Sequence, residues 1–198
     1  MGKKVATKYA IDYSEIFDAC IFSETNLYSI TEDELTSAWI ESYSQQSPLS
    51  PSIQSIILEN YTFLWDETYE RVVVAFGVSS HDSQSPKRIR DKSRIAYYYR
   101  NFIRRYQADT ASDTGHFIAH SFGGGLDMNL FPQKRDVNRG YSSEGKVYRK
   151  MESCVLINPG TFLFSRPLYY DETWRPHFIE YGIQLPGKTP CVNIFTNI

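Results

Sequence analysis

The residues richest in chemistry lie between 113 and 152, in DTGHFIAHSFGGGLDMNLFPQKRDVNRGYSSEGKVYRKME. This stretch combines histidine, asparagine, aspartate and glutamate side chains with a run of three glycines. Histidine accepts or donates a proton near neutral pH, and side-chain oxygens are the ligands that Mg²⁺ prefers. The residue types therefore point to a hydrolytic site, with or without a metal ion.

A serine hydrolase is one interpretation of this stretch. The segment 119–123, AHSFG, approximates the nucleophile elbow G-x-S-x-G, which would present Ser121 on a strand-to-helix turn. The elbow is followed by an apolar helix, whereas the residues that follow here are polar and include Pro132. Asp171 and His177 come in the right order, but their short separation leaves no room for the intervening structural units.

Two further patterns also fall short of a known site. His116 and His120 have the i, i+4 spacing of a helical zinc site, but Phe117 stands where the activating glutamate belongs. No third zinc ligand presents itself in the sequence. The triplet Gly123–Gly125 lacks the lysine and the following helix of a phosphate-binding loop, so we interpret it as an ordinary loop.

A metal-dependent nuclease explains more of the stretch. Hydrolysis of a phosphodiester needs an activated water, neutralisation of charge on the phosphate, and stabilisation of the leaving oxygen. A neutral histidine is suited to activating the water. Because Mg²⁺ keeps several waters, one asparagine oxygen together with the phosphate can anchor the ion. A nearby carboxylate can then orient the waters of the ion.

Four ordered motifs resemble the DNA/RNA non-specific endonucleases of the ββα-metal (His-Me finger) nuclease superfamily, including its toxin-type members. The family pattern runs D-x-G-H, N-x-x-P-Q, a further asparagine before a polar residue and glycine, and then a helix with an aromatic residue and a glutamate. The matching segments are Asp113–His116, Asn129–Gln133, Asn138–Gly140 and Tyr148–Glu152. The resemblance covers about 113–152 and extends more weakly into the C-terminal tail.

The resemblance implies a role for each matched polar residue. It makes His116 the general base, Asn138 the direct ligand of Mg²⁺ or Mn²⁺, and Glu152 the carboxylate that holds the ion through water. Asn129 would help to position His116 through its backbone or its side chain. We expect Asp113 to cap the turn by bonding backbone N–H groups or, alternatively, to orient His116.

The chain departs from the family pattern in two places. Thr114 stands where members of the family often have an arginine that contacts phosphate, so other cations must bind the substrate. The candidates are Lys134, Arg135, Arg139, Arg100, Arg104 and Arg105. The second departure is a longer spacing from Asn138 to Glu152, where YSSEGK is expected to lengthen the loop before a helix that starts near Gly145.

The charge is unevenly distributed along the chain. Residues 1–86 hold 4 basic and 13 acidic side chains, whereas residues 87–198 hold 17 basic and 10 acidic ones. Eight of the basic residues lie in 87–105, where Tyr97, Tyr98 and Tyr99 interrupt the cations. Cations interleaved with aromatic residues suit contact with phosphates and bases, although a solvated helix face has the same composition.

The expected fold is one α+β domain, with a mostly antiparallel sheet, flanking helices and a ββα-metal unit that holds the site. We expect an acidic, helical part over 1–60 and a nuclease core over 61–198. The expected elements are a helix over about 32–44, a short helix at 52–60, a hairpin at 61–78, a helix over 93–106, turn residues at 109–115, and strands in TFLFSRPLYY, HFIEYGIQ and CVNIFTNI. The N-terminal part would form core helices, a docking surface or an autoinhibitory cover.

Several classes of protein are excluded or kept open by the sequence. No apolar run approaches the ~20 residues of a membrane span, and the absence of a secretory signal predicts a cytoplasmic protein or one exported by a specialised route. Cys20, Cys154 and Cys191 are too few and too scattered for a disulfide framework. The substrate would be DNA, RNA or both, and a toxin of this kind would have an inhibitory (immunity) protein as partner. The alternatives are an inactive nucleic-acid-binding module and a small esterase that uses Ser121.

Overall fold

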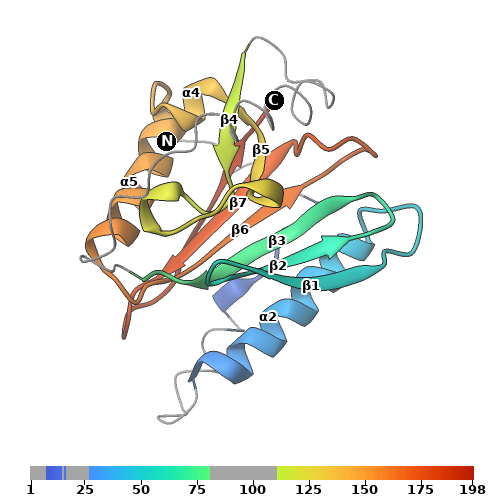
Figure 1. The fold of residues 1–198 in the computed structure, drawn as a ribbon, viewed down its shortest axis with the longest axis horizontal. Coiled ribbons are helices and arrows are strands. Elements are labelled where there is room, and N and C mark those ends of the chain that lie inside the picture. Colours follow the sequence, from blue (N-terminus) through green and yellow to red (C-terminus); the bar gives the residue numbers. More distant parts are fainter. Residues whose placement is uncertain (1–7, 15, 17–26, 81–110) are drawn as a thin grey trace.

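The structure is a computed structural model that describes residues 8–14, 16, 27–80 and 111–198 (Figure 1). The basic segment 87–105, with Arg100, Arg104 and Arg105, lies outside the described residues, and so does the helix expected over 93–106. In the described ranges, no helix is both long and apolar enough to cross a bilayer.

Six antiparallel strands form the central sheet. Their order across the sheet is β1-β2-β3-β6-β7-β8, with bounds Ile53–Leu58, Tyr61–Asp66, Arg71–Val78, Phe162–Leu168, Phe178–Gln184 and Cys191–Thr196. The hairpin expected at 61–78 and the three strands expected in the tail are confirmed. The short helix expected at 52–60 is wrong, because β1 pairs with β2 along its whole length, from Ile53 opposite Asp66 to Leu58 opposite Tyr61.

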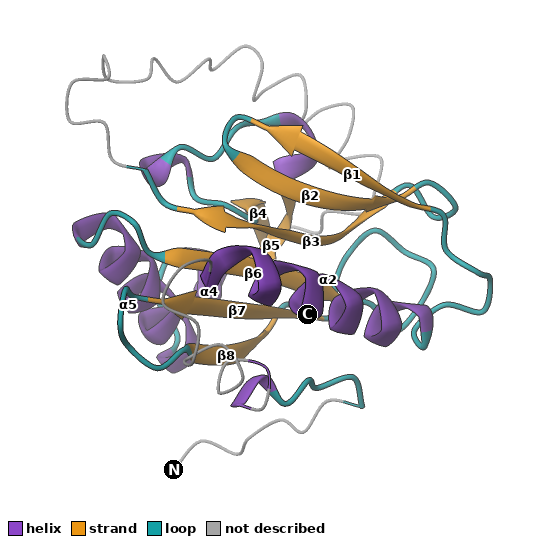
Figure 2. Cartoon of the chain, turned by 90° about the horizontal axis from the view of Figure 1, so that it is seen from below, coloured by secondary structure: helices purple, strands orange, loops and turns teal. Residues whose placement is uncertain are grey.

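One face of the sheet is covered by α2, Leu27–Ser44 (Figures 1 and 2). The helix expected over 32–44 is confirmed and begins five residues earlier. Leu35, Trp39 and Tyr43 are buried, and the Trp39 ring lies 5.1 Å from the rings of Phe76 on β3 and Phe164 on β6, measured between centroids. The C-terminal part of the acidic region is therefore a core helix.

A buried ion pair fixes the N-terminal segment on this same face. Arg166 donates from Nε to Glu180 at 2.6 Å, and both side chains are almost completely buried. Arg166 also donates to the backbone oxygen of Tyr9, and the Tyr13 hydroxyl donates to Glu180 while it accepts from Trp39 Nε1 at 3.0 Å. Burial raises the pKa of Tyr13 well above its usual value. Buried charges require such partners, so residues 8–14 are part of the fold.

The opposite face carries a second, two-stranded unit and its helices (Figure 1). Strands β4, Ser112–His116, and β5, Leu130–Lys134, are antiparallel, and α4, Arg135–Asn138, follows β5 directly. Helix α5, Ser143–Ile157, comes next and packs on β7 and β8. The expectation of a turn at 109–115 is therefore wrong from Ser112 onward, because pairing with β5 makes these turn-type residues a strand.

The connection between α4 and α5 is short. Ser142 caps α5 by accepting a hydrogen bond from Gly145 N at 3.0 Å, so the helix begins two residues before Gly145. Most of YSSEGK therefore lies in the cap and first turn of α5 instead of lengthening a loop. The resulting fold confirms the α+β class with a mostly antiparallel sheet.

Candidate active site

The loop between β4 and β5 is fastened by Asn129. Its buried amide accepts from Ile118 N at 2.8 Å and donates to the backbone oxygens of Ile118 and Gly125, and its own backbone oxygen accepts from Phe117 N. Phe117 and Ile118 come immediately after His116, so these bonds hold the chain where His116 leaves β4. The loop itself contains the short helical turns His120–Phe122 and Asp127–Asn129.

Gly115 of the first motif and Gln133 of the second pack against each other. A Cβ at Gly115 would lie 2.4 Å from Gln133 Oε1, so only glycine leaves room for this side chain. Tyr148 of α5 is completely buried, and burial raises its pKa well above the usual value. The missing side chain at Gly115 thus lets β4 approach the Gln133 side chain on β5.

Asp113 is the centre of a cluster that joins β4 to α4. Its carboxylate accepts from Arg139 Nε at 2.6 Å and Nη2 at 2.9 Å, from Arg135 Nε at 3.1 Å, and more weakly from Asn138 Nδ2 at 3.4 Å. Partial burial opposes ionisation, but the hydrogen bonds from Arg139 and Arg135 lower the pKa of Asp113 below its usual range on balance. This differs from both roles expected for Asp113, because its partners are side chains of α4.

Glu152 lies on the inner side of α5 and is almost buried. Its Oε2 accepts a hydrogen bond of 2.5 Å from Arg149 Nη1, one turn earlier on the helix. Burial raises the pKa of Glu152 to about 7, against the opposing effect of the Arg149 charge. Glu152 is therefore poised to change its ionisation near neutrality, as carboxylates at functional sites often are.

Arg149 connects this carboxylate to the α4–α5 connection. A Cβ at Gly140 would lie 3.1 Å from Arg149 Cγ, and Gly140 has a φ of 72°, which favours glycine. The stem of Arg149 therefore packs over Gly140 while its guanidinium reaches Glu152. The third and fourth sequence motifs thus meet through Arg149, a residue that the sequence interpretation did not single out as functional. Its i, i+3 spacing from Glu152 was the available signal.

His116 ends β4 opposite Leu130 and is half-buried. Its ring centroid lies 6.5 Å from that of His120, whose Nδ1 is 3.4 Å from the backbone oxygen of Gly124. The two histidines lie at a strand end and in a short turn, so they do not share a helix as a zinc site of the i, i+4 kind requires.

Ser121 is exposed in the three-residue turn His120–Phe122 between β4 and β5. The segment after it runs through a second short turn, Asp127–Asn129, into a strand. His177 lies 3.8 Å from Asp171, measured between Nε2 and Oδ2. The strand–turn–helix geometry of a nucleophile elbow is therefore absent around Ser121 in the described residues.

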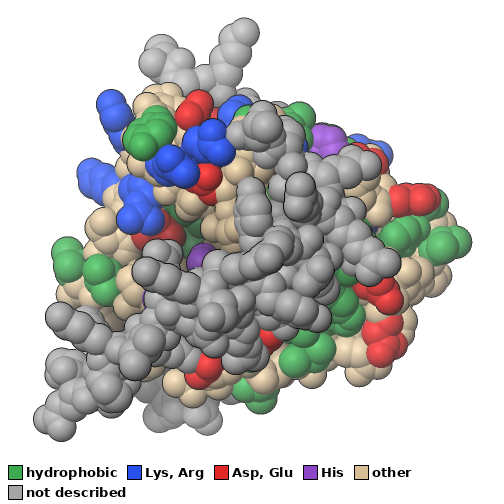
Figure 3. Space-filling model, turned by 45° about the horizontal axis from the view of Figure 1, so that its top comes forward, with side chains coloured by type: hydrophobic (Ala, Val, Ile, Leu, Met, Phe, Trp, Pro, Cys, Tyr) green, Lys and Arg blue, Asp and Glu red, His purple; other side chains and the backbone are tan. Residues whose placement is uncertain are grey.

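The expected substrate-binding cations that the structure describes fall into two groups. Lys134 is engaged by the C-terminal residues, since its Nζ donates to the backbone oxygen of Ile198 at 2.8 Å. Arg135 and Arg139 remain about half exposed although both bond to Asp113. Figure 3 shows Lys and Arg side chains gathered over the side of the molecule that carries α4 and α5, with carboxylates among them.

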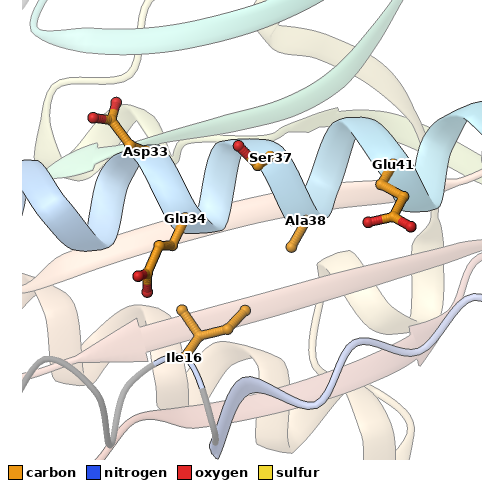
Figure 4. A pocket seen from close by; sticks show the side chains of 6 residues that line it. All are labelled: Ile16, Asp33, Glu34, Ser37, Ala38 and Glu41. Atoms are coloured by element: carbon orange, nitrogen blue, oxygen red, sulfur yellow. The ribbon is translucent and has the colours of Figure 1, made fainter.

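A separate hollow of about 460 Å³ lies against α2 and the N-terminal segment (Figure 4). Figure 4 shows Glu34, Ala38 and Glu41 on the side of the helix that faces Ile16, with Asp33 turned the other way. Its carboxylates would repel a polyanion, so this hollow is unsuited to bind nucleic acid.

The donor chemistry of the cluster fits a hydrated Mg²⁺. Asn138 turns its amide nitrogen toward Asp113, and its amide oxygen has no hydrogen-bond partner among the described residues. Within the described ranges, no group of three or more His, Cys, Asp or Glu is close enough to enclose a metal ion. Mg²⁺ commonly keeps several waters and takes only one or two protein oxygens, so Asn138 and Glu152 are the residues whose oxygens could hold it.

No protein-family profile matches this chain, and no curated protein matches it either. The nuclease family therefore enters only as a resemblance, carried by the motif residues of 113–152.

Proposed function

We propose that this chain is a metal-dependent endonuclease that hydrolyses phosphodiester bonds of DNA, RNA or both with little sequence preference. The observation that supports it most directly is the meeting of separate motifs. Asp113 of the first motif bonds Asn138 and Arg139 of the third, and Arg149 links the third motif at Gly140 to Glu152 of the fourth. Residues that act together in hydrolysis are expected to converge in this way.

His116 is the general base in this proposal. A neutral imidazole at the end of β4 takes the proton of the attacking water. Asn129 acts through the backbone, because its hydrogen bonds hold the two residues that follow His116. Asn129 is thus a positioning residue that sets the direction in which His116 leaves the strand.

Asn138 and Glu152 are the residues that would hold Mg²⁺ or Mn²⁺. Asn138 offers its amide oxygen directly, and Glu152 offers its carboxylate through water. When bound, the ion neutralises negative charge on the phosphate and on the leaving oxygen. Asp113 accepts a hydrogen bond from the amide nitrogen of Asn138, which leaves the amide oxygen for the ion. The charge of Asp113 itself is balanced by Arg135 and Arg139.

Arg135 and Arg139 contribute phosphate contacts in place of the arginine that Thr114 replaces. Each is half exposed, so a phosphate can approach the guanidinium while Asp113 holds part of it. The segment with Arg100, Arg104 and Arg105 is expected to add sequence-independent contacts. A toxin or effector role with a dedicated inhibitory protein extends the same proposal by analogy with the resembled family.

The test is digestion of plasmid DNA and of structured RNA by the purified chain, with Mg²⁺ and with EDTA. We expect cleavage with the ion and none with EDTA. Binding of either polymer without cleavage under all metal conditions would contradict the proposal and favour an inactive binding module.

A further inference from the structure

Tyr141 is a large aromatic residue held at the surface. It exposes 66% of its surface in the connection between α4 and α5, directly after Gly140. Its backbone is fixed, because its amide donates to the backbone oxygen of Asp136 at 2.9 Å. Two residues earlier, the Arg139 side chain is fixed by its bonds to Asp113. The ring of Tyr141 is therefore accessible to solvent and attached to a fixed backbone.

Cations lie near Tyr141 in the α4–α5 connection and on α5. Arg139 precedes it by two residues, and the Arg149 side chain, 57% exposed, packs over the neighbouring Gly140. Lys146 and Lys150 on α5 are exposed as well. We call Arg139, Tyr141 and Arg149 the Tyr141 surface. An accessible aromatic face with arginines nearby is the arrangement by which proteins stack a nucleobase and contact the phosphates beside it.

We propose that the Tyr141 surface binds single-stranded nucleic acid, with an unpaired base stacked on Tyr141 and phosphates on Arg139 and Arg149. The inference rests on the proposed nuclease function for its link to catalysis and deepens it by naming the substrate class. In a duplex the bases are stacked on each other, so only the phosphates can use this surface. The aromatic ring thus gives a preference for unpaired nucleotides that the arginines alone cannot give.

Arg149 also ties this surface to the proposed metal-binding carboxylate. Its guanidinium bonds Glu152 in the structure, at 2.5 Å. A phosphate that draws the exposed end of Arg149 outward leaves the Glu152 carboxylate for the ion. Binding of a single strand on the Tyr141 surface would therefore release Glu152 from Arg149 and free its carboxylate for the proposed metal site.

The test measures binding in EDTA, where no cleavage occurs, by fluorescence anisotropy of a short labelled oligonucleotide. Single-stranded DNA, single-stranded RNA and a duplex of equal length are the three probes. We expect Tyr141→Ala to weaken binding of both single strands about 10-fold and to leave the duplex unchanged, because one stacked base is lost. Tyr141→Phe retains the ring and should keep affinity within about 2-fold.

Two controls separate stacking from charge and from general damage. Arg149→Gln should weaken all three probes and flatten the salt dependence of binding, whereas Tyr141→Ala should leave the salt slope unchanged. Tyr170→Ala removes another exposed tyrosine, 44% exposed beside His177, and should have no effect on any probe.

Specific outcomes would overturn the inference. An equal loss of affinity for single strands and for the duplex would contradict base stacking on Tyr141. So would a Tyr141→Phe variant that binds single strands as weakly as Tyr141→Ala. Wild-type cleavage with unchanged single-strand binding by Tyr141→Ala rejects this surface and leaves the nuclease proposal standing. Single-strand binding that depends on Tyr141 in a chain that never cleaves rejects the nuclease proposal instead.

Discussion

The guanidinium of Arg139 holds both carboxylate oxygens of Asp113, through Nε at 2.6 Å and Nη2 at 2.9 Å. This two-pronged contact spans 26 residues of sequence and fastens α4 to β4. Such pairs fix orientation as well as distance. Because Arg139 follows Asn138 directly, and Asn138 itself donates to Asp113 at 3.4 Å, Asp113 also fixes the position of the Asn138 side chain.

Replacing His116 with alanine should abolish most of the cleavage. Loss of a general base typically lowers the rate about 10²–10⁴-fold, and the half-buried ring makes a modest contribution to packing. Single-turnover cleavage and circular dichroism measure the two effects separately. His120→Ala is the matched control in the same loop and should retain activity. A folded His116→Ala protein with full activity would remove the base assignment.

Replacing Asn138 with alanine should raise the Mg²⁺ concentration needed for half-maximal cleavage. The amide oxygen is a neutral ligand, so its loss loosens the ion without changing the net charge of the site. Affinity for nucleic acid in EDTA should stay the same, which separates an effect on the ion from an effect on the substrate. An unaltered Mg²⁺ titration would mean that the ligand lies elsewhere.

Replacing Asp113 with asparagine should have opposite effects on binding and on catalysis. The change frees the charges of Arg135 and Arg139, so affinity for nucleic acid should rise and its salt dependence should steepen. Cleavage should fall, because Asn138 loses the partner that orients it. Asp136→Asn makes the same charge change on the exposed side of α4 and serves as the control in parallel binding and cleavage assays. Equal behaviour of the two variants would contradict the positioning role of Asp113.

Glu152 should make the folded state less stable as the pH rises. Burial raises its folded pKa to about 7 from an ordinary 4.5, so between these values the folded chain holds a proton that the unfolded chain has lost. The stability cost is complete above about pH 7 and amounts to on the order of 3 kcal/mol at most. Glu152→Gln removes this titration. The free energy of unfolding, measured with urea in EDTA, should therefore rise for the variant relative to the wild type from pH 5 to pH 8. Parallel pH profiles of the two unfolding free energies would contradict the raised pKa of Glu152.

Removing the hydroxyl of Tyr13 should destabilise the chain by about 1–3 kcal/mol, because Glu180 and Trp39 Nε1 both lose a buried partner. Tyr9→Phe is the control, since Tyr9 contributes its backbone oxygen to Arg166 and that oxygen is unaffected. Urea unfolding at one pH compares the two. A Tyr13→Phe protein as stable as the control would mean that the network tolerates the loss.

The sequence predicted the elements whose pattern is strong. Helix α2 has spaced apolar residues, although the capping-box spacing expected to start it lies inside the helix, and β2, β3 and the tail strands are rich in β-branched and aromatic side chains. The short apolar run of β1 does not distinguish a strand from a buried helix, and only its pairing with β2 decides. Likewise β4 consists of turn-type residues, and its strand conformation depends on β5, which lies beyond a loop.

The motif residues of the candidate site could be identified from sequence, but their partners could not. The bonds of Asp113 to Arg135 and Arg139 join elements that are distant along the chain, and no local pattern encodes them. The contact of Arg149 with Glu152 is local and was predictable from helical spacing. The exposure of Tyr141 was not predictable, because aromatic side chains are usually buried. Only the conformation of the turn at Gly140 places this ring at the surface.

The bonds of Tyr9 and Tyr13 to Arg166 and Glu180 also bear on how the chain folds during synthesis. They join residues separated by 157 and 167 positions, so the segment 8–14 can dock only after β6 and β7 have been synthesised. Contacts between residues so far apart in the sequence form late and slow folding. Until β6 emerges, the apolar side of α2 is covered only in part, by β3, and the remainder is open to capture by chaperones. The segment 8–14 is thus among the last parts of this fold to dock.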